Sequence, residues 1–328
     1  MTTPARWALG YFSLAGDSFT GLVVGDRARD LRNDSELGSA SLGTPSGTRV
    51  LLEEWDAVFP TLDSLSRDAT GVWHNTSALT VHAPLLPGQI LQAGANYRTH
   101  VIDLAVTHAD LSNGVTEEQV RAETAVMMDK RKAEGIPYFF IGLPSAITGP
   151  DDIVTLPSYS EKHDWELELA AVIGTSGFRL TPAEALAHVA AYVMVNDLTT
   201  RDLVFRRDMP EIGSDWFRAK NAPGFLPLGP WLVPAQFVGD PQALHLELKL
   251  NGEIKQHAEA SDMLFTVAEL LAAASQTVVL NPGDLILTGS PAGNGAHWGR
   301  LLRDGDLMES TIDGLGVQHT RVVAEGTR

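Results

Sequence analysis

The chain has 328 residues, of which 44% are hydrophobic, so it can bury a large core in two domains or in one large domain with a smaller appendage. It carries 24 Lys and Arg against 41 Asp and Glu, a formal charge of −17, which excludes nucleic acids and anionic membranes as expected partners. The absence of cysteine excludes disulfides, thiolate metal sites and a cysteine nucleophile.

Residues 1–84 predict a small β-rich domain, with a boundary near Pro84. The stretches WALGYFSLAG and FTGLVVGDRARDL look like strands broken by Gly and Asp, and a loop rich in small residues precedes a short helix near LLEEWDAVF. The first residues lack the pattern of a signal peptide, and no apolar run approaches the roughly 18 residues of a spanning helix. We therefore expect a cytoplasmic protein.

Residues 85–328 predict a larger domain that is mostly β with a few helices. A helix is expected over 116–135, where Thr116 can cap the first turn. Further helices are expected in TPAEALAHVA and in SDMLFTVAELLAAASQTV. The strand-like stretches are FFIGLPSAI, DIVTLP, WELELAAVIG, AAYVMVND, HLELKLNGEIKQ and DLILTG. Within HLELKLNGEIKQ, Asn251 and Gly252 predict a type I′ hairpin turn.

Two glutamates open the apolar stretch HDWELELAAVIG (163–174). On a strand, Glu166 and Glu168 share one face and stand roughly 6.5–7 Å apart, so their carboxylates can converge on one ion. An isolated pattern of this kind is more often a solvated strand edge. Here the following LAAVIG is apolar on both faces, which is typical of a buried strand. Burying an unpaired carboxylate is costly, and a bound divalent cation would offset the cost.

The next predicted strand, AAYVMVND, ends at Asp197. A helix separates the two strands, and such a strand–helix–strand unit can bring strand ends side by side. Three carboxylates without a Cys or His partner suit Mg²⁺ or Mn²⁺ better than zinc. Taken alone, Asp197 could equally cap the turn in NDLTTRD.

Other polar residues accompany this predicted metal site. Arg201 and Lys220 could bind a carboxylate or an enolate, although a salt bridge or a solvated cation is the usual interpretation of either residue alone. In GANYRTHVID, His100 and Asp103 share one face of a short helix, and a carboxylate beside a histidine raises its basicity. The Gly-rich turn TGSPAGNG (288–295) could offer backbone N–H groups to an anion or be a plain loop.

In this order, the motifs resemble the fumarylacetoacetate hydrolase family. The resemblance spans roughly residues 88–295 and is carried by QILQAGANYRTH, GLPSAITGP, DWELELAAVIG, VMVNDLTTRD, AKNAPGFLPLGP, LKLNGEIKQ and NPGDLILTGSPAGNG. It implies a mixed β-sandwich roll of the fumarylacetoacetate hydrolase type (α+β), usually a homodimer. It also implies bound Mg²⁺, Mn²⁺ or Ca²⁺ and a small-molecule keto acid as substrate.

The resemblance implies roles for nine residues: Glu166, Glu168 and Asp197 as metal ligands; His100, Asp103 and Lys220 in catalysis; Tyr97, Arg201 and Ser290 in substrate binding. His100 would activate water, and Lys220 would stabilise developing oxyanion charge. Asp103 stands where the family often has Glu, and Ser290 stands where it has Thr in TGTP.

The implied reaction is hydrolysis of a C–C bond in an acylpyruvate or β-diketo acid. The alternative is a decarboxylase or keto-enol isomerase or tautomerase of a 2-keto diacid at the same metal site. Two departures favour it mildly, since Val204 replaces Gln and Gly142 replaces Lys, and both changes remove polar groups. A catalytically inactive binding domain is disfavoured because the three carboxylates and the histidine are present. The segment 103–136 is longer than expected and predicts a lid or pocket wall.

Overall fold

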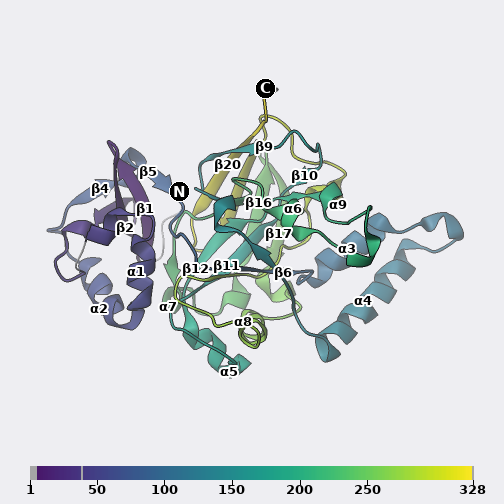
Figure 1. The fold of residues 1–328 in the computed structure, drawn as a ribbon, viewed down its shortest axis with the longest axis horizontal. Coiled ribbons are helices and arrows are strands. Elements are labelled where there is room, and N and C mark those ends of the chain that lie inside the picture. The colour runs from purple at the N-terminus through teal and green to yellow at the C-terminus, as the bar shows by residue number, and fades with distance from the viewer. Residues whose placement is uncertain (1–5, 38–39, 327–328) are drawn as a thin grey trace.

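The computed structural model describes residues 6–37 and 40–326, which form mixed β-sheets with several helices, an α+β fold without a closed barrel (Figure 1). Its described α-helices are α1 (Gly47–Glu53), α2 (Trp55–Leu65), α3 (Arg98–His108), α4 (Glu117–Glu134), α5 (Pro182–Ala185), α6 (Trp216–Lys220), α7 (Ala235–Val238), α8 (Val267–Ser275) and α9 (Gly295–Trp298). None of the helices in these residue ranges is long and apolar enough to cross a membrane.

The N-terminal residues form an antiparallel five-stranded sheet in the order β4-β3-β2-β1-β5. Its strands are β1 (Ala8–Leu14), β2 (Asp17–Val24), β3 (Arg27–Asp30), β4 (Trp73–Asn75) and β5 (Thr80–His82). The two predicted strand regions are confirmed, and the expected short helix is a pair, α1 and α2, which begins earlier and ends later than predicted.

The N-terminal sheet packs against the rest of the chain. The backbones of Leu9 and Leu232 exchange two hydrogen bonds of 2.9 Å. Trp7 and Leu22 belong to the same buried cluster as Ala170 and Val172. The division into two domains at Pro84 stays a prediction.

A six-stranded sheet forms the centre of the molecule, in the order β15-β12-β11-β18-β6-β7. Its strands are β6 (Ile90–Gly94), β7 (Tyr138–Gly142), β11 (Leu167–Ile173), β12 (Val189–Asn196), β15 (Val233–Pro234) and β18 (Leu285–Leu287). Every residue of β11 and β12 is buried, as their continuous apolar sequences predict for a strand covered on both faces. The pair is antiparallel, so the start of β11 lies beside the end of β12.

A second five-stranded sheet has the order β17-β16-β19-β20-β9. Its strands are β9 (Ile153–Leu156), β16 (His245–Leu250), β17 (Glu253–Glu259), β19 (Leu307–Ile312) and β20 (Val317–Ala324). Alternate residues of β16 are buried, because only one face of this sheet lies on the core. Asn251 and Gly252 have φ values of +52° and +85°, which confirms the predicted hairpin turn.

Two short strand pairs complete the β-structure: antiparallel β10 (His163–Asp164) with β13 (Thr199–Thr200), and parallel β8 (Ile147–Thr148) with β14 (Leu226–Pro227). The helix predicted over 116–135 is confirmed as α4, with a capping box between Thr116 and Gln119. The two other predicted helices are shorter than expected, since α5 gives way to a 3-10 turn and α8 begins only at Val267. Figure 1 shows α3 and α4 on the side of the molecule opposite the N-terminal sheet.

Candidate active site

Three carboxylates meet where β11 begins and β12 ends. Glu166 immediately precedes β11, Glu168 is the second residue of β11, and Asp197 follows β12 directly. The backbone N–H of Asp197 donates to the Glu166 carbonyl over 2.8 Å, which fixes the two strand ends together. One oxygen from each carboxylate lies within 4.8 Å of the others. The convergence predicted from the sequence is therefore present.

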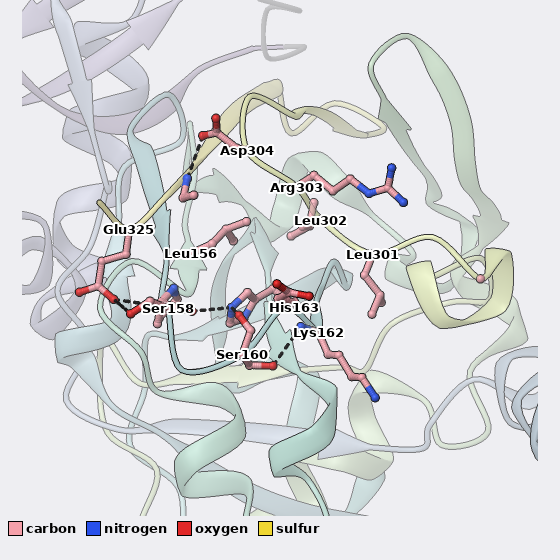
Figure 2. Close-up of a pocket in the computed structure, with 14 residues that line it drawn as sticks. Leu156, Ser158, Ser160, Lys162, His163, Leu301, Leu302, Arg303, Asp304 and Glu325 are labelled. Atoms are coloured by element: carbon pink, nitrogen blue, oxygen red, sulfur yellow. Dashed lines mark hydrogen bonds between the residues drawn. The ribbon is translucent and has the colours of Figure 1, made fainter. Parts of the chain in front are cut away.

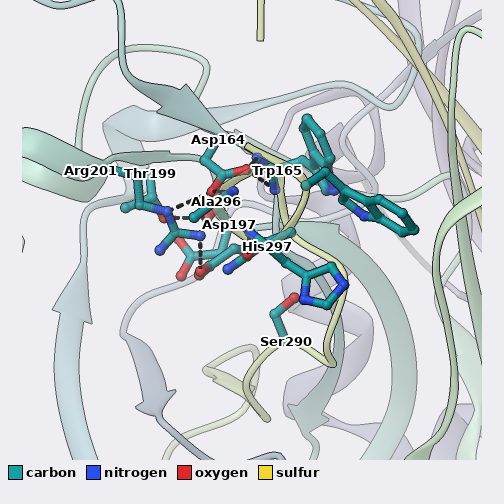
Figure 3. Close-up of polar contacts among 12 residues, drawn as sticks. Asp164, Trp165, Asp197, Thr199, Arg201, Ser290, Ala296 and His297 are labelled. Carbon is teal, nitrogen blue, oxygen red and sulfur yellow. Dashed lines mark hydrogen bonds and ion pairs between the residues drawn. The ribbon is translucent and has the colours of Figure 1, made fainter. Parts of the chain in front are cut away.

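Two positively charged side chains, Lys220 and Arg201, pair with this carboxylate cluster. Lys220 Nζ lies 2.6 Å from both Glu166 Oε2 and Asp197 Oδ2, and it donates to the Asp197 carbonyl over 2.9 Å. Arg201 donates from Nη2 to Glu166 Oε1 over 2.6 Å and from Nε to Asp164 Oδ2 over 2.7 Å (Figure 3). Both cations are thus engaged by acidic side chains of the site.

The charges of the cluster fit a divalent cation. Asp164 and the three converging carboxylates are buried, whereas Lys220 and Arg201 are the two cations that the structure places against them. Four carboxylates against two cations leave two negative charges, which one divalent ion would balance. The donors are all carboxylate oxygens, the type that hard cations such as Mg²⁺ and Mn²⁺ prefer.

Neighbouring amides orient two of the carboxylates. Gln92 on β6 donates from Nε2 to Asp197 Oδ1 over 2.6 Å, and the backbone N–H of Gly289 donates to Glu168 Oε2 over 2.8 Å. Gly289 has φ of +89°, and a Cβ there would lie 3.0 Å from the Asn96 Cβ, so glycine suits this position. The Gly-rich turn therefore does offer an N–H to an anion, and that anion is the protein's own carboxylate.

Burial and neighbouring charges separate the pKa values of the three carboxyl groups. Burial raises the pKa of Glu166, but the charges of Arg201 and Lys220 outweigh it and hold the pKa below its usual value. Burial and the charge of Asp197 raise the pKa of Glu168 well above normal. Burial also raises the pKa of Asp197, to about 6, against the lowering effect of Lys220. A bound cation would compete with protons at Glu168 and Asp197.

His100 is the third residue of α3, which begins four residues after the end of β6. Asn96 fixes this segment, because its side chain exchanges hydrogen bonds with the Phe265 backbone and donates to the Thr288 carbonyl. Burial lowers the pKa of His100 to about 4, so its imidazole is neutral near pH 7. A neutral imidazole can accept a proton.

A cavity of about 220 Å³ joins these groups. Its wall includes seven of the nine residues singled out in the sequence: His100, Glu166, Glu168, Asp197, Arg201, Lys220 and Ser290. Tyr97 is fully buried and does not line the cavity. Asp103 also lies outside the wall, and its carboxylate is 2.7 Å from Arg121 Nη1 and 3.8 Å from His297 Nδ1.

The predicted lid segment, 103–136, divides into two parts. Its first part is the end of α3, where Leu104 lines the cavity beside Val101, which precedes the segment, so α3 is a wall of the site. Helix α4 lies behind it, and Arg131 of α4 donates to the Ala95 carbonyl over 2.6 Å. Ala95 is itself part of the cavity wall.

Sequence reasoning missed several residues of the site. Asp164 alternates with Glu166 and Glu168 in HDWELE, so the same two-residue period could have identified it. It accepts hydrogen bonds from the backbone N–H groups of Gly295 and Ala296 as well as from Arg201. Gln92, Phe140 and Trp216 also belong to the site. Gln92 lies in the motif QILQAGANYRTH but was not singled out there, and no motif or spacing points to Phe140 or Trp216.

A larger cavity of about 690 Å³ lies beside β9 and the end of β20 (Figure 2). His163 borders it, but Nδ1 lies 3.0 Å from Thr200 Oγ1 and Nε2 lies 2.9 Å from the Ser160 carbonyl. With both ring nitrogens engaged, this histidine has a structural role. The smaller cavity combines converging carboxylates with a neutral histidine and is therefore the candidate active site.

Comparison with known sequences identifies a family whose model covers most of the chain. The model described as "Fumarylacetoacetate (FAA) hydrolase C-terminal" matches residues 89–323. A 2,4-didehydro-3-deoxy-L-rhamnonate hydrolase of Sphingomonas sp. (strain SKA58) is 40% identical over 189 residues, 57% of this chain and 65% of that protein. The chain thus matches less than two thirds of that relative. A mitochondrial oxaloacetate tautomerase of Xenopus laevis is 30% identical over 303 residues, 92% of this chain and 86% of that protein.

Solved structures share the fold. A putative HpcE protein from Mycobacterium smegmatis is 30% identical with a TM-score of 0.73, and the match covers 96% of this chain and 99% of that chain. A maleylpyruvate hydrolase from Sphingobium sp. SYK-6, solved with manganese(II) and pyruvate, has a TM-score of 0.74 at 23% identity, covering 97% and 100% of the two chains. At that identity the likeness concerns the fold alone.

Proposed function

Since the chain belongs to the fumarylacetoacetate hydrolase family, we propose that it is a divalent-metal-dependent hydrolase of a C–C bond in an acylpyruvate or related β-diketo acid. The observation that carries this proposal is one cavity that joins three converging carboxylates to a buried neutral histidine. The carboxylates suit a hard cation and the histidine suits a general base, and hydrolysis of a diketo acid uses both.

Glu166, Glu168 and Asp197 would hold Mg²⁺, Mn²⁺ or Ca²⁺. When bound, such a cation supplies Lewis acidity toward the keto-acid oxygens and orients the substrate. The excess negative charge of the cluster supports this assignment, as does the burial of the carboxylates. Gln92 and Gly289 keep two ligands oriented through their hydrogen bonds.

His100 takes a proton from the attacking water. The water oxygen adds to the distal carbonyl carbon, the bond to the methylene carbon breaks, and its electron pair leaves as the enolate of a 2-keto acid. Protonation of that enolate completes the reaction. The charge of Asp103, one turn along α3, favours the imidazolium that forms at His100, and Arg121 holds the Asp103 carboxylate in place.

Lys220 carries the positive charge for the departing enolate. It is 1% exposed, and although burial lowers its pKa, the charges of Asp197 and Glu166 outweigh this and raise it, so the ammonium persists. Arg201 and Ser290 line the same cavity and would bind substrate oxygens. Tyr97 does not line the cavity and would contribute indirectly, by fixing the start of α3, which it directly precedes.

The test combines metal removal with a change at the base. Metal-free protein is expected to release no pyruvate from an acylpyruvate until Mg²⁺ or Mn²⁺ is restored. His100→Ala is expected to lower kcat by on the order of 10²–10⁴ while Mn²⁺ affinity stays unchanged. Full activity without metal would contradict the metal assignment, and full activity of the variant would contradict the role of His100.

A tautomerase or decarboxylase of a 2-keto diacid is the second candidate, because the Xenopus laevis relative is named as an oxaloacetate tautomerase. It would use the same cluster to stabilise an enolate but would need no attacking water. Product analysis by NMR separates the two candidates. Conversion of oxaloacetate with no cleavage of any acylpyruvate would favour the second.

We also propose that the enzyme is a homodimer. Large apolar side chains are exposed in the stretch between Arg201 and Lys220, with Phe205, Ile212 and Phe217 at 69%, 63% and 68%. Sedimentation velocity measures the state directly. A single monomeric species at micromolar concentration would contradict the proposal.

A further inference from the structure

The wall of the candidate active site divides into a charged part and an apolar part. The charged part consists of the carboxylate cluster with its two cations and His100. The apolar part is formed by the side chains of Val101, Leu104, Tyr138, Phe140 and Trp216. The two parts meet where Lys220 Nζ lies 5.7 Å from the centre of the Phe140 ring.

Aromatic rings dominate the apolar part. Phe140 on β7 and Trp216 on α6 stack with their centroids 4.8 Å apart and an interplanar angle of 18°. The ring centroid of Tyr138 lies 6.3 Å from that of Phe140. The face of an aromatic ring carries negative partial charge, so this surface favours apolar or cationic groups and repels carboxylates.

The cations in the wall are already neutralised. Lys220 and Arg201 are the two Lys or Arg side chains among the described residues that line the cavity. Lys220 is held between Glu166 and Asp197, and Arg201 binds Asp164 and Glu166. With their charges matched by these carboxylates, the two cations supply no net positive charge for a second carboxylate at the far end of a substrate.

The arginines on α3 and α4 are also engaged. Arg98 pairs with Asp129, Arg121 pairs with Asp103, and Arg131 donates to the carbonyls of Gly94 and Ala95. Position 142 on β7 would direct a side chain toward Gln92, since a Cβ there would lie 2.7 Å from Gln92 Oε1, but glycine places no charge at that point.

We infer that the apolar part is a subsite for an uncharged acyl group. The substrate class is then a 2,4-diketo monoacid with a short apolar tail, rather than a dicarboxylate of the same length. A cavity of about 220 Å³ is smaller than the sites of roughly 300–1,000 Å³ that hold drug-sized ligands, so the tail is short. This inference rests on the proposed function, because it takes the keto-acid end of the substrate to lie at the carboxylate cluster.

Two keto acids of equal length test the subsite without turnover. The metal-loaded full chain is titrated calorimetrically with 2-oxopentanoate and with 2-oxoglutarate, which differ in the terminal carboxylate and lack the 4-keto group needed for cleavage. The monoacid is expected to bind more tightly by on the order of 100-fold, because a second carboxylate would be desolvated without a partner. Equal affinities, a preference for 2-oxoglutarate, or no binding of either would overturn the inference.

A charge placed in the subsite should reverse the preference. Leu104→Arg is expected to improve the affinity for 2-oxoglutarate relative to 2-oxopentanoate by at least about tenfold. Val126→Arg adds the same charge on α4, where the side chain is 69% exposed, and is expected to leave the ratio unchanged. Val101→Lys repeats the test if Leu104→Arg does not fold. An equal change in the Val126→Arg control would overturn the inference.

A hydrolysis assay separates this inference from the function on which it rests. Wild-type protein is assayed with acetylpyruvate, the acylpyruvate with a methyl tail. Absence of cleavage would contradict the proposed hydrolase, whereas the binding ratio of the two 2-oxo acids still decides on the apolar subsite.

Discussion

Glu166 and Glu168 are two residues apart, but their charges are balanced in different ways. Glu166 accepts hydrogen bonds from Arg201 and Lys220, so its charge is matched by the protein itself. In the part of the chain that the structure describes, Glu168 accepts one hydrogen bond, from the Gly289 backbone. Glu168 is therefore the carboxylate whose charge most requires a bound cation.

Glu168→Gln is expected to weaken Mn²⁺ binding by at least about tenfold and to stabilise the metal-free protein by on the order of 1 kcal/mol. The reason is that the substitution keeps the shape while removing a carboxyl group whose pKa is raised by burial and by the charge of Asp197, which costs stability at neutral pH. Calorimetric titration and urea unfolding measure the two effects.

Glu253→Gln is the matched control for this change, because the Glu253 side chain is 77% exposed on β17. It is expected to alter neither quantity. Unchanged Mn²⁺ affinity in Glu168→Gln would exclude Glu168 from the ligand set.

Asp306, which lies away from the candidate active site, should make the free energy of unfolding depend on pH. It is buried, which raises its pKa, but hydrogen bonds from Arg300, Asn251 and the Arg303 backbone outweigh burial and lower the pKa overall. A lowered folded-state pKa stabilises the fold above the unfolded-state pKa of about 4 and loses that contribution as the pH falls through the folded-state value.

Asp306→Asn is therefore expected to cost about 1.5–3 kcal/mol at pH 7 and less at pH 3. Urea unfolding of both proteins at the two pH values measures this. A difference between variant and wild type that stays constant from pH 7 to pH 3 would argue against an ionised Asp306 in the fold.

Among the elements, the pair α3 and α4 decides how firmly the base is held. Helix α3 carries His100 and lines the cavity, α4 braces it through Arg121, and Arg131 of α4 holds the segment just before α3. Helix α4 is also anchored by Met128, which is fully buried, and by the ion pair of Lys132 with Glu269. A substitution that weakens the packing of α4 should therefore also loosen α3 and the position of His100.

Met128→Ala is expected to destabilise this pair of helices by about 2–5 kcal/mol and to speed amide exchange over 98–134. The adjacent Met127→Ala is the control, since Met127 is 48% exposed. Hydrogen–deuterium exchange followed by mass spectrometry compares the two. Equal exchange in both variants would contradict the anchoring role of Met128.

Elements and ligands with a regular period could be predicted from the sequence. The alternation in DWELELAAVIG identified a buried strand and two of its carboxylates, and the Thr116 and Gly135 signals bounded α4. Short helices such as α6 and α9 could not be predicted, because four or five residues show no helical period. The aromatic contact of Phe140 with Trp216 depends on tertiary packing between segments 76 positions apart. Local sequence patterns carry no information about such a contact.

For the whole molecule, the charge of −17 is a source of self-repulsion that the local ion pairs do not remove. The metal-free protein is therefore expected to gain a few degrees in Tm between about 10 mM and 200 mM NaCl, as the Debye length falls from about 30 Å to below 10 Å. Scanning calorimetry measures the change. Tetramethylammonium chloride should act like NaCl, and a response to NaCl alone would indicate specific ion binding instead of screening.

The parallel pairing of β18 with β6 joins segments that are far apart in the chain, as the hydrogen bond between Gln89 and Asp284, 195 positions apart, shows. Gly289 follows β18, so its N–H reaches Glu168 only after this closure. A chain still growing on the ribosome can hold β11 and β12 before β18 exists, and at that stage Glu168 lacks its backbone donor. The hydrogen bond that orients Glu168 therefore forms late in synthesis, only after β18 and Gly289 have been added to the chain.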